Sequence, residues 1–95
     1  MKNYVIIDDE PRSVETLHNI VTNFSDFDLK YLGSAHNIED GFNLIKQTKP
    51  DLVFLDIEMP FGSGFDLLEK FEKINFQVIF TTGFDQYAIT AIKFS

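Results

Sequence analysis

Short apolar runs alternate with amphipathic stretches along this 95-residue chain. The runs are YVII (4–7), LKYLGSA (29–35), LVFL (52–55) and VIFTT (78–82). The first, third and fourth are nearly continuous, which is typical of strands buried on both faces of a sheet. The second contains a lysine and a glycine, so we expect it at an edge. Strands that alternate with helices predict an α/β fold, in which a parallel sheet has right-handed crossovers and helices on both faces.

Helices are predicted between these runs, where apolar residues recur at steps of three and four. The first predicted helix has Pro11 in its first turn, the second follows Asn37, the third follows Ser63 and Gly64, and a last one covers 85–95. Pro11 suits the first turn of a helix, because its missing N–H has no partner there in any case. Asn37 with Asp40 resembles an N-terminal capping arrangement.

Length and composition limit what the chain can be. Ninety-five residues predict one domain, residues 1–95. The formal charge of −7 and the scattered lysines argue against nucleic-acid binding by this chain. Cysteine is absent, which excludes a disulfide framework. No stretch approaches the roughly 18 apolar residues of a membrane span, and the apolar run near the N-terminus is too short for a signal peptide. We therefore expect a soluble, cytoplasmic domain that does not bind a membrane.

Polar side chains gather where the predicted strands end. Asp8 and Asp9 follow the first run, Asp56 follows the third, and Thr81 and Thr82 end the fourth. In open parallel sheets these ends meet at one edge, where ligands bind. Two carboxylates about 4 Å apart repel by about 4 kcal/mol at an effective dielectric of about 20. Mg²⁺, which binds one or two carboxylates together with phosphate oxygens, would relieve that repulsion.

A carboxylate in such a cluster can also act as a nucleophile and form an acyl phosphate. The cation would then neutralise charge on the transferred phosphoryl group, and a hydroxyl from the neighbouring strand could donate a hydrogen bond to it. Glu10 is better explained by the N-terminus of the first helix, which favours acidic residues. His18 and His36 have no partners at ligand spacing, so surface or packing roles are predicted for both.

Three ordered motifs carry a resemblance to a known family. They are IIDDEP (6–11), DLVFLDIEMPFGSGFDLL (51–68) and VIFTTGFDQYAITAIKF (78–94). Together they resemble the receiver domain of two-component response regulators. DDEP and FTTGFDQYAI are more narrowly similar to receivers joined to LytTR-type DNA-binding output domains. The resemblance implies a flavodoxin-like doubly wound sheet with strand order 2-1-3-4 in this chain.

The resemblance also implies roles for individual residues. Asp56 would be the phosphoacceptor, with Asp8 and Asp9 as the acidic pair that binds Mg²⁺ beside it. Asp9 is the more direct metal ligand of the two, and the backbone carbonyl of Glu58 would be a further ligand. Thr82 matches the switch hydroxyl that contacts the phosphoryl group.

The family has a fifth strand with a lysine at its end, and we find no counterpart to either in this chain. The chain is therefore expected to stop inside a fourth helix, with Lys93 in that helix and not at the family's lysine position. Run 78–82 would then be an exposed sheet edge, which invites association or exchange of elements with another copy.

The resemblance favours a signalling switch, not an enzyme. A sensor histidine kinase would phosphorylate Asp56, and the change in state would control an output domain that regulates transcription. One alternative is a pseudo-receiver, a binding module of the same fold that is never phosphorylated. Another is an aspartyl-phosphate phosphatase, but such enzymes carry D-x-D on their first strand, whereas the candidate nucleophile here is Asp56 on the third.

Overall fold

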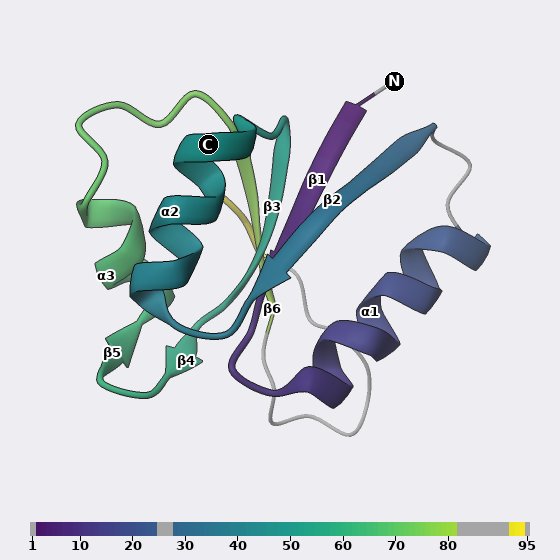
Figure 1. Ribbon diagram of the computed structural model, residues 1–95, viewed down its shortest axis with the longest axis horizontal. Helices are drawn as coiled ribbons and strands as arrows, with labels where there is room; N and C mark the ends of the chain where they lie inside the picture. The colour runs from purple at the N-terminus through teal and green to yellow at the C-terminus, as the bar shows by residue number, and fades with distance from the viewer. Residues whose placement is uncertain (1, 25–27, 82–91, 95) are drawn as a thin grey trace.

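The computed structural model describes residues 2–24, 28–81 and 92–94, with helices on both sides of a central sheet (Figure 1). In chain order the elements are β1 (Lys2–Ile7), α1 (Pro11–Phe24), β2 (Leu29–Ala35), α2 (Ile38–Thr48), β3 (Leu52–Asp56), β4 (Glu58–Met59), β5 (Gly62–Ser63), α3 (Gly64–Glu69), β6 (Gln77–Thr81) and β7 (Ile92–Phe94). Within the described residues, no helix is long and apolar enough to span a bilayer.

The main sheet has the order β2-β1-β3-β6-β7, and its first four strands are parallel. These four strands are the four apolar runs, so the predicted flavodoxin-like order 2-1-3-4 is confirmed. The run predicted at an edge, β2, is the first strand of the sheet. The carboxyl ends of β1 and β3 point to the same edge, the lower one in Figure 1.

Alternate residues of the central strands supply two separate cores. Tyr4 and Ile6 of β1 pack with α1, while Val5 and Ile7 pack on the face covered by α2 and α3. This alternation follows from the two-residue period of a strand, and it explains why β1 is apolar on both faces. Each fully buried aliphatic side chain contributes about 1.5–3 kcal/mol to folding.

Two side-chain caps fix where the helices beside the carboxyl edge begin. The side chain of Asn37 accepts a hydrogen bond from the backbone N–H of Asp40 at 2.7 Å, as predicted. Ser63 forms a reciprocal capping box with Asp66 at the start of α3. Each cap satisfies backbone N–H groups that the first turn of a helix leaves without partners.

The prediction of a helix over 85–95 is wrong for residues 92–94. These residues form β7, which pairs antiparallel with β6 and places Lys93 opposite Ile79. The rest of the predicted helix lies outside the described residues.

The prediction of an exposed sheet edge at run 78–82 is also wrong for Val78, Ile79 and Phe80, because β7 pairs with these three residues. The physical reason is that a sheet edge leaves backbone groups unpaired, and an adjacent segment of the same chain can satisfy them.

The segment after β3 contains a small hairpin that the sequence did not predict. Glu58 and Met59 of β4 pair antiparallel with Ser63 and Gly62 of β5. Pro60 and Phe61 form the two-residue connection, and Phe61 has a φ of 65°. The hairpin lies at the same lower edge of Figure 1 as the end of β3.

Candidate functional site

Three carboxylates meet at the carboxyl edge of the sheet. β1 and β3 are parallel neighbours with Ile7 opposite Leu55, so the residues that follow, Asp8 and Asp56, lie side by side. One carboxylate oxygen each from Asp8, Asp9 and Asp56 lies within 4.8 Å of the others. The sequence therefore predicted correctly that these three side chains converge.

The backbone holds Asp8 and Asp56 in similar ways. Asp8 is 6% exposed, and its Oδ1 accepts a hydrogen bond from the backbone N–H of Glu10 at 2.9 Å. Asp56 is 4% exposed, and its Oδ1 accepts from the backbone N–H of Glu58 at 3.3 Å. Asp9, in contrast, is exposed to solvent. The site thus has two buried carboxylates and one that faces the entrance.

Burial above all, and then the nearby charge of Asp8, raise the pKa of Asp56 from 3.8 to about 7. The bond from the Glu58 amide acts in the opposite direction, but it is weaker than burial. Burial also raises the pKa of Asp8, with Asp9 and Glu10 adding to the effect. The charged groups that shift the pKa values of Asp8 and Asp56 are all acidic. The cluster therefore carries negative charge that a bound cation would offset.

The donor set suits a hard divalent cation. Carboxylate oxygens are ligands that Mg²⁺ prefers, and its opposite ligands stand about 4 Å apart. The 4.8 Å span of the three carboxylate oxygens is close to that separation.

Of the two other predicted site residues, Glu58 and Thr82, the structure describes only Glu58. Glu58 begins β4 and lies two residues after Asp56, with its side chain exposed. Thr82 lies outside the described residues. Its neighbour Thr81 is buried and opposite Asp56 in the register of β3 and β6, and the Thr81 carbonyl accepts from the backbone N–H of Ile57 at 3.1 Å.

Gly64 packs directly against the backbone of the candidate acceptor. A Cβ at this position would lie 2.5 Å from the carbonyl oxygen of Asp56 and 2.9 Å from Cγ of Leu55. The backbone N–H of Gly64 donates to the carbonyl of Ile57 at 2.8 Å. The absence of a side chain at Gly64 therefore lets the start of α3 lie against the end of β3.

His36 is a residue of this site that the sequence analysis missed. Its Nδ1 lies 2.9 Å from the backbone carbonyl oxygen of Asp8. The missed signal was its position, because His36 directly follows β2 and the carboxyl end of β2 reaches the same edge as β1. The prediction of a surface or packing role was therefore incomplete for His36. His18 does have a packing role, with its ring against Tyr31 and its Nδ1 3.1 Å from the hydroxyl of Tyr4.

Comparison with known proteins identifies the family. Residues 4–95 match the family model of the response regulator receiver domain. The chain belongs to the receiver domain family. This receiver domain is 39% identical over 94 residues to an uncharacterised response regulatory protein of Vibrio vulnificus. It is 32% identical over 95 residues to the sensory transduction protein LytT of Bacillus subtilis. Each match covers 98% of this chain, but only 38% and 39% of the respective relatives.

Solved structures agree with this assignment. The MaeR response regulator bound to beryllium trifluoride superposes with a TM-score of 0.74 and 30% sequence identity, over 90% of this chain and 70% of that one. The receiver domain described here is therefore a signalling domain of two-component systems, as the motifs indicated. The chain spans less than two fifths of the length of its curated relatives.

Proposed function

We propose that this receiver domain accepts a phosphoryl group on Asp56 from a sensor histidine kinase, with Mg²⁺ bound beside it. The observation that carries the proposal is the convergence of Asp8, Asp9 and Asp56 within 4.8 Å at the ligand-binding edge of the sheet. Two of these carboxyls, Asp8 and Asp56, are buried and have raised pKa values, which is typical of functional sites.

Each carboxylate has a distinct role in this proposal. Asp9, the exposed one, is the direct metal ligand, and Asp8 is held beside it by the amide of Glu10. Asp56 and the backbone carbonyl of Glu58 complete the protein ligands. Bound Mg²⁺ supplies positive charge that offsets the carboxylates and the phosphoryl oxygens.

Transfer requires Asp56 in its ionised form, because the carboxylate oxygen is the nucleophile. The oxygen attacks phosphorus, a P–O bond forms, and the P–N bond of the donor's phosphohistidine breaks. The electron pair of that bond stays on the imidazole nitrogen of the donor. Since burial raises the pKa of Asp56 to about 7, neutralisation of the surrounding charge favours the reactive form.

The consequence of phosphorylation is a shift between two conformations. Thr82 is the proposed switch hydroxyl, on the strength of the family resemblance and of Thr81 lying opposite Asp56. We propose that the shift controls an output domain outside this chain, of the LytTR-type that binds DNA, in the cytoplasm. The similarity to LytT supports this type of output.

The test is incubation with acetyl phosphate and Mg²⁺, followed by intact mass spectrometry. One added phosphoryl group is expected on the wild type and none on Asp56→Asn. Glu15→Gln, which removes an exposed carboxylate on α1, should be labelled like the wild type. A folded wild type that is not labelled would contradict the proposal and leave the pseudo-receiver.

A further inference from the structure

The exposed ring of Phe61 does not help this chain to fold. Its relative exposure is 105%, against 40% for Ile20 and 47% for Phe65 among the large apolar side chains described as exposed. Its φ of 65° is in the left-handed region, which bulky residues rarely adopt. Strained residues of this kind cluster at functional sites, so we expect the ring to contact a partner.

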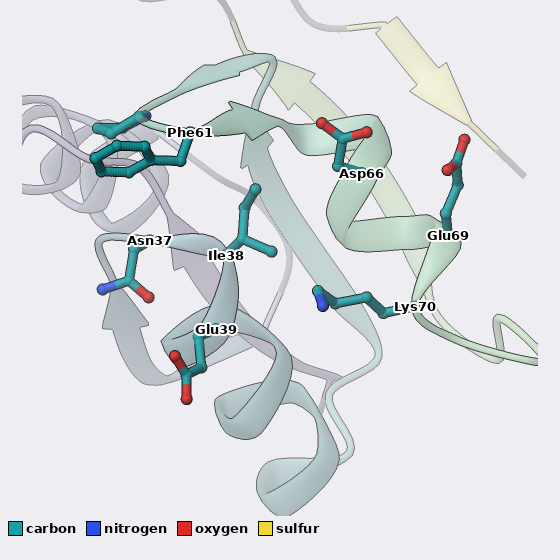
Figure 2. A pocket seen from close by; sticks show the side chains of 8 residues that line it. Asn37, Ile38, Glu39, Phe61, Asp66, Glu69 and Lys70 are labelled. Carbon is teal, nitrogen blue, oxygen red and sulfur yellow. The ribbon is translucent and has the colours of Figure 1, made fainter.

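Acidic side chains surround this ring. The groove beside Phe61 is lined by Glu39, Asp66 and Glu69, with Lys70 as the one cation among its lining residues. Figure 2 shows the three carboxylates projecting from the start of α2 and from α3 around the groove. The β4–β5 hairpin and the adjacent starts of the two helices therefore form an acidic surface with a protruding aromatic ring. We call it the hairpin surface.

A second pocket, of about 410 Å³, lies at the opposite end of the same layer of helices. The end of α2 and the segment after α3 form it, and both lie at the top of Figure 1, whereas the hairpin lies at the bottom. Its apolar walls are Ile45, Pro50, Phe71 and Phe76. The two phenylalanine rings are only half-buried, so a side chain that enters the pocket can contact them.

This pocket is basic, although the chain as a whole is acidic. Lys46, Lys49 and Lys73 line it, against one carboxylate, that of Asp51, which accepts a hydrogen bond from the backbone N–H of Asn3 at 2.8 Å. The C-terminus of α2 favours basic residues and accounts for the first two lysines. It does not account for the third, which lies on the segment after α3. We call this cavity the lysine pocket.

The hairpin surface and the lysine pocket are complementary in shape and in charge. Phe71 and Phe76 lie edge to face, with their centroids 5.4 Å apart, and aromatic rings prefer such contacts at about 4.5–7 Å. The pocket beside them can therefore accept the ring of Phe61. The carboxylates of Glu39 and Glu69 beside that ring are opposite in sign to the three lysines around the pocket.

We propose that the hairpin surface of one copy of this chain docks in the lysine pocket of a second copy, with the ring of Phe61 inside the pocket. The contact is heterologous, because two different surfaces meet. Each pair therefore keeps one free hairpin surface and one free lysine pocket, at opposite ends, and repetition of the contact builds chains of copies. The net charge of −7 repels two copies at long range, so the association depends on local complementarity and is weak.

Sedimentation velocity over a series of protein concentrations measures this association, at an ionic strength that screens the long-range repulsion. The wild type should form dimers and longer species as the concentration rises. Phe61→Ala should raise the dissociation constant about tenfold or more, because it removes the aromatic side chain at the centre of the contact. Phe61→Tyr keeps the ring and should associate like the wild type.

Charge variants test the pocket. The double variant Lys46→Glu with Lys73→Glu should stay monomeric over the same series, because carboxylates would then face carboxylates. Arg12→Glu with Lys30→Glu is the matched control, since it changes the net charge equally at exposed residues of α1 and β2. Ile20→Ala is the control for the loss of an exposed apolar side chain. Both controls should associate like the wild type, and urea unfolding verifies that each variant is folded.

A mixture of the two defective variants distinguishes this contact from a symmetric one. Phe61→Ala retains the lysine pocket and the double lysine variant retains the ring, so together they can form one contact and no more. The mixture should contain a heterodimer and no larger species. A wild type that stays monomeric would overturn the inference. So would association of either defective variant as strong as that of the wild type, or a mixture that stays monomeric or grows beyond the heterodimer.

Discussion

The ring of His36 bonds the backbone of Asp8, with 2.9 Å between Nδ1 and the carbonyl oxygen. A carbonyl only accepts hydrogen bonds, so Nδ1 carries the proton and Nε2 is the other ring nitrogen. The backbone N–H of Asp8 in turn donates to the carbonyl of Ala35 at 3.0 Å. The end of β2 therefore holds Asp8 through two bonds from consecutive residues, which makes His36 a positioning residue for the acidic cluster.

Replacement of His36 should weaken metal binding without removing a ligand. We expect His36→Ala to lower Mg²⁺ affinity by about tenfold, because partners that orient metal ligands typically contribute at least that much. Isothermal titration calorimetry measures the affinity directly. His18→Ala is the matched control, since His18 lies on α1 with its ring against Tyr31 of β2 and should change stability but not affinity. Equal affinities for the wild type and His36→Ala would show that the bond to Asp8 does not orient the site.

Stability without metal should fall as the pH rises. Folding raises the pKa of Asp56 from 3.8 to about 7, so the folded state binds more protons than the unfolded state between these values. The free energy of unfolding therefore decreases from about pH 4 to about pH 7, by about 2–4 kcal/mol. Urea unfolding in the presence of EDTA across this range measures the slope. Asp56→Asn should flatten the slope and be more stable than the wild type near pH 7, and an unchanged slope would contradict the raised pKa.

Mg²⁺ should reverse that loss of stability. A ligand that binds only the folded state adds about 2.7 kcal/mol at a hundredfold excess over its Kd. We expect this gain near pH 7 for the wild type and for Glu15→Gln, whose lost carboxylate is on α1 away from the cluster. Asp9→Asn should lose most of the gain, because it removes the exposed ligand. Urea unfolding with and without MgCl₂ tests the assignment, and an equal gain in all three proteins would contradict it.

The contact between Gly64 and Asp56 should not tolerate a methyl group. A Cβ 2.5 Å from the Asp56 carbonyl must displace backbone, which costs about 1–3 kcal/mol in a well-packed site. Gly64→Ala should therefore be destabilised and also be labelled more slowly by acetyl phosphate. Ser63→Ala, which removes only the cap of α3, should cost about 1 kcal/mol and leave labelling nearly unchanged. If Gly64→Ala and Ser63→Ala were labelled at equal rates, the packing of Gly64 would not affect the geometry of Asp56, and the prediction would be wrong.

The sequence predicted those features of the fold and the site that follow from hydrophobic periodicity and from the order of the strands. Buried runs set the four parallel strands, and their ends predicted that Asp8, Asp9 and Asp56 converge. Details that depend on tertiary contact were not predictable in this way. Three such contacts are the close approach of Gly64 to Asp56, the bond from His36 to Asp8 and the pairing of β7 with β6. Each joins two segments of the chain, and no local sequence pattern indicates that the two segments lie close together. The β4–β5 hairpin was missed for a different reason, since its turn places phenylalanine where glycine or asparagine is the usual signal.

That turn leads to a prediction about stability. Phe61 has a φ of 65° and a fully exposed ring, so the side chain adds strain and little packing. Phe61→Gly should raise the free energy of unfolding by about 1 kcal/mol, because glycine adopts the left-handed region without steric cost. Phe61→Ala keeps the backbone cost and loses only an exposed ring, so it should match the wild type in urea unfolding. If Phe61→Ala instead lost as much stability as the truncation of a buried phenylalanine, about 3–5 kcal/mol, the ring would have to pack against this domain.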